Sequence, residues 1–111
     1  MNTTSHIAEI KTVLENHFGR GDYFVFVFGS RARGEAKPTS DWDIGVFSNS
    51  RVRPSKMFFA REELEKIRTL NKFDLVDFWM TAPEFRKNAA RTILPLIGDS
   101  KKWIKKLSET I

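Results

Sequence analysis

Apolar residues repeat at the spacing of an α-helix in the first part of the chain. From Thr4 to Phe18, apolar side chains recur every three or four positions, which predicts a helix with one buried side. Thr4 or Ser5 is expected to cap the start of this helix. Gly19 and Gly21 are expected to end it.

Three further segments have helical patterns. Apolar positions predict a longer helix at about 55–70. Thr81 and Glu84 have the spacing of a capping box, with a proline between them in the first turn, so another helix is expected to start there. A final helix is expected at about 100–110, capped by Asp99 or Ser100, with apolar residues on one side.

Short apolar runs rich in aromatic and β-branched residues separate these helices. Strands are expected at 23–28, 43–48 and 73–80, with a polar loop at 49–54. The segment 92–97 is compatible with a short edge strand, because Pro95 cannot donate a ladder hydrogen bond. The order of elements predicts an α/β (α+β) protein in which helices cover a small sheet.

Composition limits the function. At 111 residues, the chain is expected to be one domain, 1–111, with a single modest core. It has no cysteine, which excludes disulfides and thiolate chemistry.

No apolar run reaches membrane-spanning length, so no membrane association and a cytoplasmic location are expected. A net charge of +5 is compatible with polyanionic partners, namely nucleotides, RNA or an acidic protein.

Several conspicuous side chains have simple structural interpretations. The lysines near the C-terminus fall on the polar side of a helix, which indicates a solvated face. Direct nucleic-acid binding by the chain is not expected. His17 has no acidic companion at useful sequence spacing. Trp79 and the pair Phe58 and Phe59 are expected in the core, whereas Trp103 is the best single guess at a contact with a partner.

Gly29 and Ser30 end the first strand and precede Arg-Ala-Arg-Gly. A glycine followed by a small hydroxyl residue suits a tight turn into a short helix, whose free backbone N–H groups bind phosphate oxygens. Gly29 and Gly34 have the spacing of P-loop glycines. Glu35 and the alanine after it stand where a P-loop requires Lys and Ser or Thr, so that interpretation fails.

Asp41 and Asp43 introduce the second strand and point to the same face of it, because side chains alternate across a strand. Two carboxylates side by side repel each other. Magnesium prefers carboxylates together with substrate phosphates. This pair is therefore a candidate metal site, placed after a candidate phosphate-binding turn.

The third strand supplies two more acidic residues, Asp74 and Asp77. They are three positions apart and so point to opposite faces, and only one of them can join Asp41 and Asp43. Periodicity does not choose between them, since both faces are otherwise apolar. A buried unpaired carboxylate is costly, so the inward one is expected to have a metal or a cation beside it.

These motifs, in this order, resemble the DNA polymerase beta-like nucleotidyltransferase superfamily, and most closely its minimal nucleotidyltransferase branch. The shared pieces are G-S-x-A-R-G at 29–34, S-D-x-D at 40–43 and the D-L-V that begins at Asp74. Gly45 departs from the family, in which an aliphatic residue is commoner there. This leaves a space that a base or another side chain might fill, but it removes no ligand.

The resemblance implies a small mixed sheet flanked by helices and a magnesium-dependent site that uses two Mg²⁺ ions. Asp41, Asp43 and Asp74 would be the metal-binding and catalytic residues. Gly29, Ser30, Arg33 and Ser40 would bind the nucleotide. Arg31 is also a plausible phosphate contact, but Arg33 matches the family's A-R-G.

The resemblance also implies an activity and a partner. Family enzymes transfer a nucleoside monophosphate from a nucleoside triphosphate, here expected to be ATP, to a hydroxyl group and release pyrophosphate. The chain has no room for an acceptor-binding domain, so a HEPN-like helical-bundle partner would supply the acceptor, with this chain as the antitoxin. Two alternatives are a non-catalytic module that neutralises its partner by occlusion, and a transferase that acts on a small molecule such as an aminoglycoside.

Overall fold

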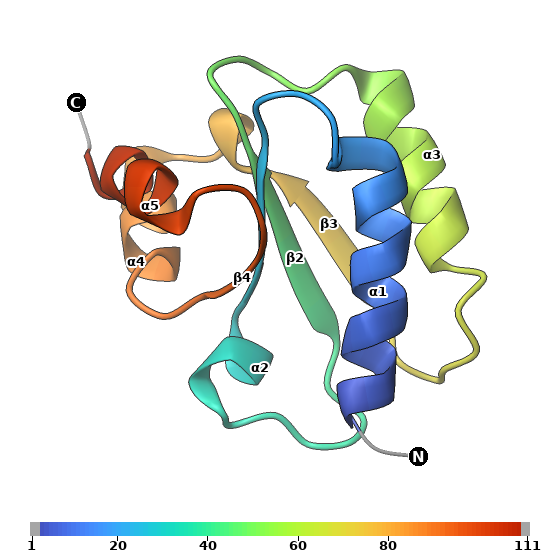
Figure 1. Ribbon diagram of the computed structural model, residues 1–111. Helices are drawn as coiled ribbons and strands as arrows, with labels where there is room; N and C mark the ends of the chain where they lie inside the picture. The colour runs from blue at the N-terminus through green and yellow to red at the C-terminus, as the bar shows by residue number, and fades with distance from the viewer. Residues whose placement is uncertain (1–2, 110–111) are drawn as a thin grey trace.

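The computed structural model describes residues 3–109, and the side chains of residues 6–109. Its elements follow one another in the order helix, strand, short helix, strand, helix, strand, 3₁₀ turn, helix, strand, helix (Figure 1). Their bounds are α1 Thr3–Phe18, β1 Phe24–Phe28, α2 Ser30–Arg33, β2 Trp42–Phe47, α3 Pro54–Leu64, β3 Phe73–Asp77, η1 Phe78–Met80, α4 Pro83–Ala89, β4 Leu94–Ile97 and α5 Ser100–Ser108.

The four strands form one mixed sheet in the order β3-β2-β1-β4. β1 pairs with β2 and with β4 in antiparallel fashion, whereas β2 and β3 are parallel. Pro95 lies in β4 at the edge of the sheet, where it pairs with Phe26 next to a register irregularity between β1 and β4. The small mixed sheet flanked by helices is therefore confirmed.

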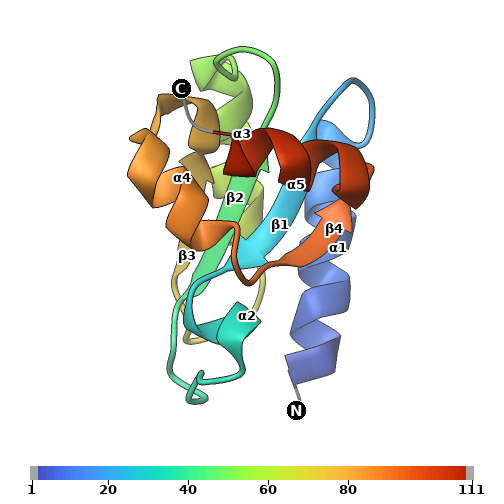
Figure 2. The same ribbon diagram turned by 90° about the vertical axis from the view of Figure 1, so that its left-hand side faces the viewer.

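Helices cover both faces of the sheet (Figures 1 and 2). α1 and α3 lie over one face, and α4 and α5 lie over the other, with α2 at the lower end in Figure 2. The first face buries the alternate strand residues Val25, Val27, Ile44 and Val46 against the helices α1 and α3. The second face buries Phe24, Phe26, Phe28 and Phe47 with Phe78, Trp103 and Leu107.

The aromatic second face explains Gly45. A methyl group on Gly45 would lie 2.5 Å from Phe26 Cζ and 2.7 Å from Phe78 Cε1, closer than side chains pack. The space left by the missing side chain is therefore filled by two core aromatic rings. Of the two occupants expected from the sequence, a base or another side chain, the structure therefore shows side chains.

Most predicted elements are present, with changes at their ends. The third strand stops at Asp77, because the chain turns into η1 where 73–80 was expected to stay extended. α3 ends at Leu64 and not near residue 70. Asp99 caps α5 through hydrogen bonds from Lys101 N and Lys102 N, as predicted.

The capping box at Thr81 is absent. The N-cap of α4 is Ala82 with no side-chain bond, and Thr81 Oγ1 instead donates to Phe78 O at 2.7 Å, closing η1. α1 ends at Phe18, just before Gly19, as predicted. The proposed caps Thr4 and Ser5 have side chains outside the described part of the chain.

Three expectations about aromatic residues are wrong. Trp103 is 1% exposed and packs edge-on against Phe47, so it is a core residue and not a partner contact. Phe58, Phe59 and Trp79 are 53%, 58% and 46% exposed, where burial was expected. Phe58 and Phe59 lie on α3 beside its buried residues, and Trp79 lies in η1, where the expected strand has already ended.

His17 does have an acidic companion. Its Nε2 lies 3.0 Å from Glu63 Oε1, which joins the end of α1 to α3 across 46 positions of sequence. This contact comes from helix packing, so sequence spacing could not reveal it.

None of the helices in the described part of the chain combines the length and the apolar character needed to span a membrane.

Candidate active site

One row of residues crosses three neighbouring strands near the lower end of the sheet in Figure 1. Strand pairing places Phe28 of β1 opposite Asp43 of β2, and Asp43 opposite Asp74 of β3. Asp43 and Asp74 lie on the face that α4 and α5 cover, because their neighbours Gly45 and Val76 contact the aromatic cluster there. The first turn after β1 begins immediately beyond Phe28.

Gly29 forms the turn between this row and α2. Its φ of 75° and ψ of −153° belong to a region that only glycine adopts readily. A methyl group on Gly29 would collide with Asp43 Oδ2 and lie 3.2 Å from Asp43 Cγ. The Asp43 carboxylate therefore rests directly against the backbone of the turn, which joins the two sequence motifs in one place.

The surroundings of Asp43 disfavour its negative charge. Burial raises the pKa of Asp43, and the negative charges of Asp74 and Asp41 raise it further, while Arg33 opposes them. Asp41 and Asp74 are exposed and Asp43 is partly buried. Three carboxylates thus face a common region, and a bound cation would relieve their repulsion.

Asp77 has a structural role. It is 9% exposed, and its carboxylate accepts hydrogen bonds from Val52 N at 2.9 Å and Trp79 N at 3.0 Å. These amides compensate its burial, so no metal or cation is needed to explain the buried position of Asp77. The register with Asp43 places Asp74, and not Asp77, beside the other two carboxylates.

Arg31 and Ser40 hold the loop that leads to Asp41. The Arg31 guanidinium lies 4.1 Å from the centre of the Trp42 ring and donates to Ser40 O at 2.8 Å. Asn71 Nδ2 donates to the same carbonyl at 3.0 Å, and Lys37 N donates to Ser40 Oγ at 2.9 Å. Burial lowers the pKa of Arg31, which agrees with its structural role.

Arg33 is the more available arginine of the loop. Its side chain is half exposed and forms one ion pair with Glu35 at 2.8 Å, which is also exposed. An exposed pair of this kind is worth about 0–1 kcal/mol and is easily exchanged for another anion. A contact from Arg33 or Ser40 to a nucleotide stays a prediction.

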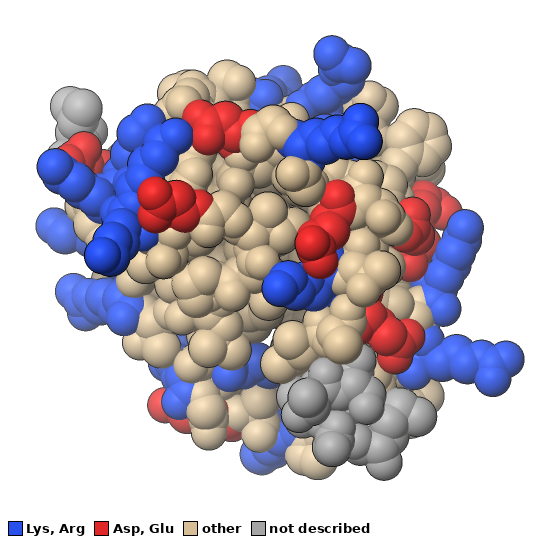
Figure 3. Space-filling model, viewed as in Figure 1, with Lys and Arg blue, Asp and Glu red and all other residues tan. Residues whose placement is uncertain are grey.

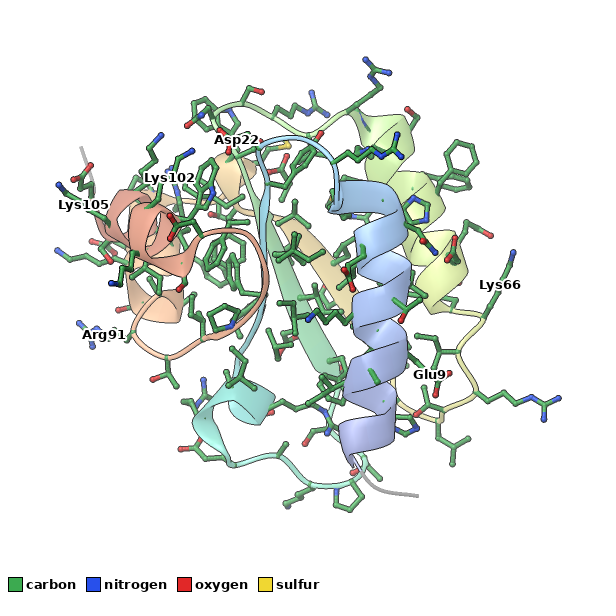
Figure 4. The ribbon with its side chains drawn as sticks, viewed as in Figure 1. Glu9, Asp22, Lys66, Arg91, Lys102 and Lys105 are labelled. Atoms are coloured by element: carbon green, nitrogen blue, oxygen red, sulfur yellow. The ribbon has the colours of Figure 1, made fainter. Side chains whose placement is uncertain are left out.

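A cavity of about 380 Å³ opens beside the turn. Its lining residues are Phe28, Gly29, Arg33, Phe85, Asn88, Ala89, Arg91 and Thr92. Phe85 is 44% exposed, and its ring packs edge-on against Phe28 at 6.0 Å between centroids. Figure 4 places Arg91 at the end of α4, on the outer side of this region. Sequence analysis missed this cavity because α4 reaches the turn only through the fold.

Within the described residues, no three His, Asp or Glu side chains form a ready-made metal site. The three carboxylates of Asp41, Asp43 and Asp74, called the acidic row below, therefore offer oxygen ligands suited to Mg²⁺. By themselves they do not enclose a cation. Magnesium commonly takes one or two carboxylates and completes its coordination with waters and substrate phosphates.

Residues 8–102 match the family model described as "Polymerase beta, Nucleotidyltransferase". The chain belongs to the polymerase beta nucleotidyltransferase family. The match includes the Gly29 turn and the whole acidic row, and it confirms the enzyme class predicted from the sequence, a nucleotidyltransferase. The chain is also 30% identical over 107 residues to a Haemophilus influenzae protein named probable protein adenylyltransferase MntA, covering 93% of this chain and 88% of that one.

Solved structures share the fold of this family member at lower sequence identity. A toxin-antitoxin crystal structure with AMP-PNP has a TM-score of 0.72 and 17% identity, covering 92% of this chain and 80% of that one. A complex of tri-AMPylated Shewanella oneidensis HEPN toxin with MNT antitoxin has a TM-score of 0.69 and 15% identity, covering 95% and 79%.

Proposed function

We propose that this protein transfers a nucleoside monophosphate from ATP to a hydroxyl group of a HEPN-like partner protein, as the antitoxin of a two-gene pair. The observation that carries the proposal is the acidic row packed against the Gly29 turn. The similarity to a probable protein adenylyltransferase and to toxin-antitoxin structures supports a protein acceptor.

The reaction forms one bond and breaks one bond at the α-phosphorus of ATP. The acceptor oxygen bonds to phosphorus, the bond to the β-phosphate bridging oxygen breaks, and pyrophosphate leaves with that electron pair. Asp74 is exposed beside Asp43 and is proposed to accept the proton of the acceptor hydroxyl. Ser30 and the first amides of α2 are proposed to bind the outer phosphates, with Arg33 and Ser40 as further contacts.

Asp41, Asp43 and Asp74 would hold two Mg²⁺ ions. The donor set fits a hard cation, because it consists of carboxylate oxygens. Burial raises the pKa of Asp43, and the repulsion from Asp74 and Asp41 raises it further, so a cation would stabilise the ionised form. When bound, the ions would activate the attacking oxygen and stabilise the leaving pyrophosphate. The protein supplies position and charge.

The cavity beside Gly29 is proposed to hold the nucleoside. It lies on the same side of the sheet as the acidic row, and the exposed ring of Phe85 offers a flat apolar surface for a base. Replacing Phe85 by Ala is expected to raise the KM for ATP at least about fivefold while kcat changes little. An unchanged KM would place the base elsewhere.

The decisive assay combines the protein with α-labelled ATP, magnesium and the product of the neighbouring gene. The wild type is expected to label the partner protein, and Asp43→Asn is expected to reduce labelling at least about 100-fold. Asp22→Asn is the matched control, because Asp22 is an exposed aspartate that pairs with Lys102 far from the row. Equal labelling by wild type and Asp43→Asn would refute catalysis at this site.

Two further experiments distinguish the proposal from the two other functions predicted from the sequence. Occlusion predicts that the double variant of Asp41→Asn with Asp43→Asn neutralises the partner as fully as the wild type. Transfer to a small molecule predicts drug resistance in cells that express this chain alone. The proposal requires loss of neutralisation in the first case and no resistance in the second.

A further inference from the structure

A second and larger cavity lies at the opposite end of the sheet from the acidic row. It has a volume of about 670 Å³, and its lining residues are His17, Tyr23, Arg51, Arg53, Ser55, Lys56 and Phe59. These residues come from the end of α1, the start of β1, the loop after β2 and the first two turns of α3. The cavity shares no residue with the site proposed for nucleotidyl transfer.

The charge of this cavity is strongly one-sided. Arg51, Arg53 and Lys56 line it, and within the described residues none of them lies within 4.0 Å of a carboxylate. Nearby acids already have partners, since Glu63 pairs with His17 and Asp22 pairs with Lys102. The buried Asp77 carboxylate behind the loop accepts hydrogen bonds from Val52 N and Trp79 N. In Figure 3, Lys and Arg side chains gather along the upper edge of the molecule, over the turns that lead into β1 and α3.

Exposed aromatic rings border the same cations. Phe59 lines the cavity, and Phe58 packs edge-on against it at 5.3 Å between centroids. Both rings are more than half exposed, so burial in this chain does not account for them. Lys56 Nζ lies 5.5 Å from the centre of the Tyr23 ring, which places a positive charge directly beside an aromatic wall.

We propose that this surface binds single-stranded RNA. Unpaired cations contact phosphates, and exposed rings stack on bases, which is the combination used by proteins that bind single strands. A duplex would leave the rings without bases to stack on, because paired bases are already stacked. An acidic peptide would use the cations but not the rings. The hydroxyl groups of Tyr23 and Ser55 line the cavity and suit the ribose 2′-hydroxyl.

The cations of this cavity are distinct from the lysines of α5. Those lysines were interpreted from the sequence as a solvated helix face, and Lys102 and Lys106 are indeed occupied by Asp22 and Asn49. The arginines of the loop after β2 and the rings of α3 are adjacent only in three dimensions. The two ends of the sheet would therefore serve different ligands.

The test measures the fluorescence anisotropy of a labelled ten-nucleotide oligo(U) RNA with the full chain. Arg51→Gln with Arg53→Gln is expected to weaken binding at least about tenfold and to reduce the slope of log K against log salt by about 1.4. The matched control is Lys66→Gln with Arg68→Gln, which removes the same charge from the segment beyond α3 (Figure 4 labels Lys66 there). This control is expected to change binding less than twofold.

A second pair of variants tests stacking. Phe59→Ala is expected to weaken binding at least about fivefold with an unchanged salt slope. Leu70→Ala, at a fully exposed apolar position that does not line the cavity, is expected to have no effect. Circular dichroism and thermal unfolding establish that each variant is folded, and nucleotidyl transfer is expected to remain at the wild-type rate.

Four results would overturn the proposal. Equal weakening by both charge variants would show that RNA responds only to the net charge of a basic protein. Equal affinity for duplex RNA or for DNA of the same sequence would contradict the assignment to single-stranded RNA. Loss of partner binding without loss of RNA binding in the Arg51 and Arg53 variant would make the surface a protein interface. Absence of measurable binding by the wild type at low salt would exclude RNA altogether.

Discussion

Replacing Gly29 by Ala tests the link between the turn and the acidic row. The backbone of Gly29 lies in a region that costs other residues about 1–3 kcal/mol. The added methyl group would also collide with the Asp43 carboxylate. We therefore expect the free energy of unfolding to fall by about 1–3 kcal/mol and the carboxylate to be displaced.

Gly34 is a matched control for this change. It also has a positive φ, 74°, but a methyl group there would meet no atom within 4 Å. Gly34→Ala should cost about 1–2 kcal/mol through its backbone alone. It is expected to leave the transfer rate within about threefold of wild type, because α2 keeps its start at Ser30.

Urea unfolding and labelling of the partner protein measure the two effects separately. At a temperature where both variants are folded, Gly29→Ala is expected to label at least about 100-fold more slowly than Gly34→Ala, because small misplacements of a catalytic group have effects of this size. Similar rates for the two alanine variants would refute the reasoning. So would a fully active Gly29→Ala protein, since Asp43 would then not depend on the turn.

Three further changes probe the row and its support. Without magnesium, Asp43→Asn is expected to raise the free energy of unfolding in urea at neutral pH, because the raised pKa of Asp43 means that its ionised form opposes folding. This gain in stability should vanish below roughly pH 4, where Asp43 is protonated in both the folded and the unfolded state. A gain that persists there would show that the charge of Asp43 is not its cause. Asp77→Ala is expected to lower the free energy of unfolding by about 1–3 kcal/mol because two amides lose their acceptor, and an unchanged urea midpoint would contradict that role. Gly45→Ala should cost about 1–3 kcal/mol by overpacking Phe26 and Phe78, whereas a stabilised variant would show that the rings move apart freely.

The sequence predicted those features that depend on local spacing. The strand-turn-helix pattern predicted the turn at Gly29, which the structure has. Alternation across a strand predicts that Asp41 and Asp43 share one face, and the structure begins β2 at Trp42, between them. The choice between Asp74 and Asp77 needed a resemblance, because it depends on how β3 pairs with β2. The parallel register provides the physical reason, and the two amides that bind Asp77 explain the other aspartate.

Features made by contacts between distant segments could not be predicted in this way. The resemblance favours Arg33 over Arg31 as a phosphate contact, but only the fold places Trp42 and the Ser40 carbonyl beside Arg31. The cavity that Phe85 lines and the pairing of His17 with Glu63 have the same origin. Exposure of Phe58 was missed because helical periodicity gives a direction but not the width of the surface that covers it.

Strand pairing across the acidic row has a consequence for synthesis of the protein in the cell. Phe28 and Asp43 are paired by β1 and β2, whereas Asp74 becomes a neighbour of Asp43 only when β3 has joined β2. A nascent chain that ends before residue 74 has no third carboxylate in place. The nucleotidyl transfer proposed for this site therefore has all three of its acidic residues only after about two-thirds of the chain has been synthesised.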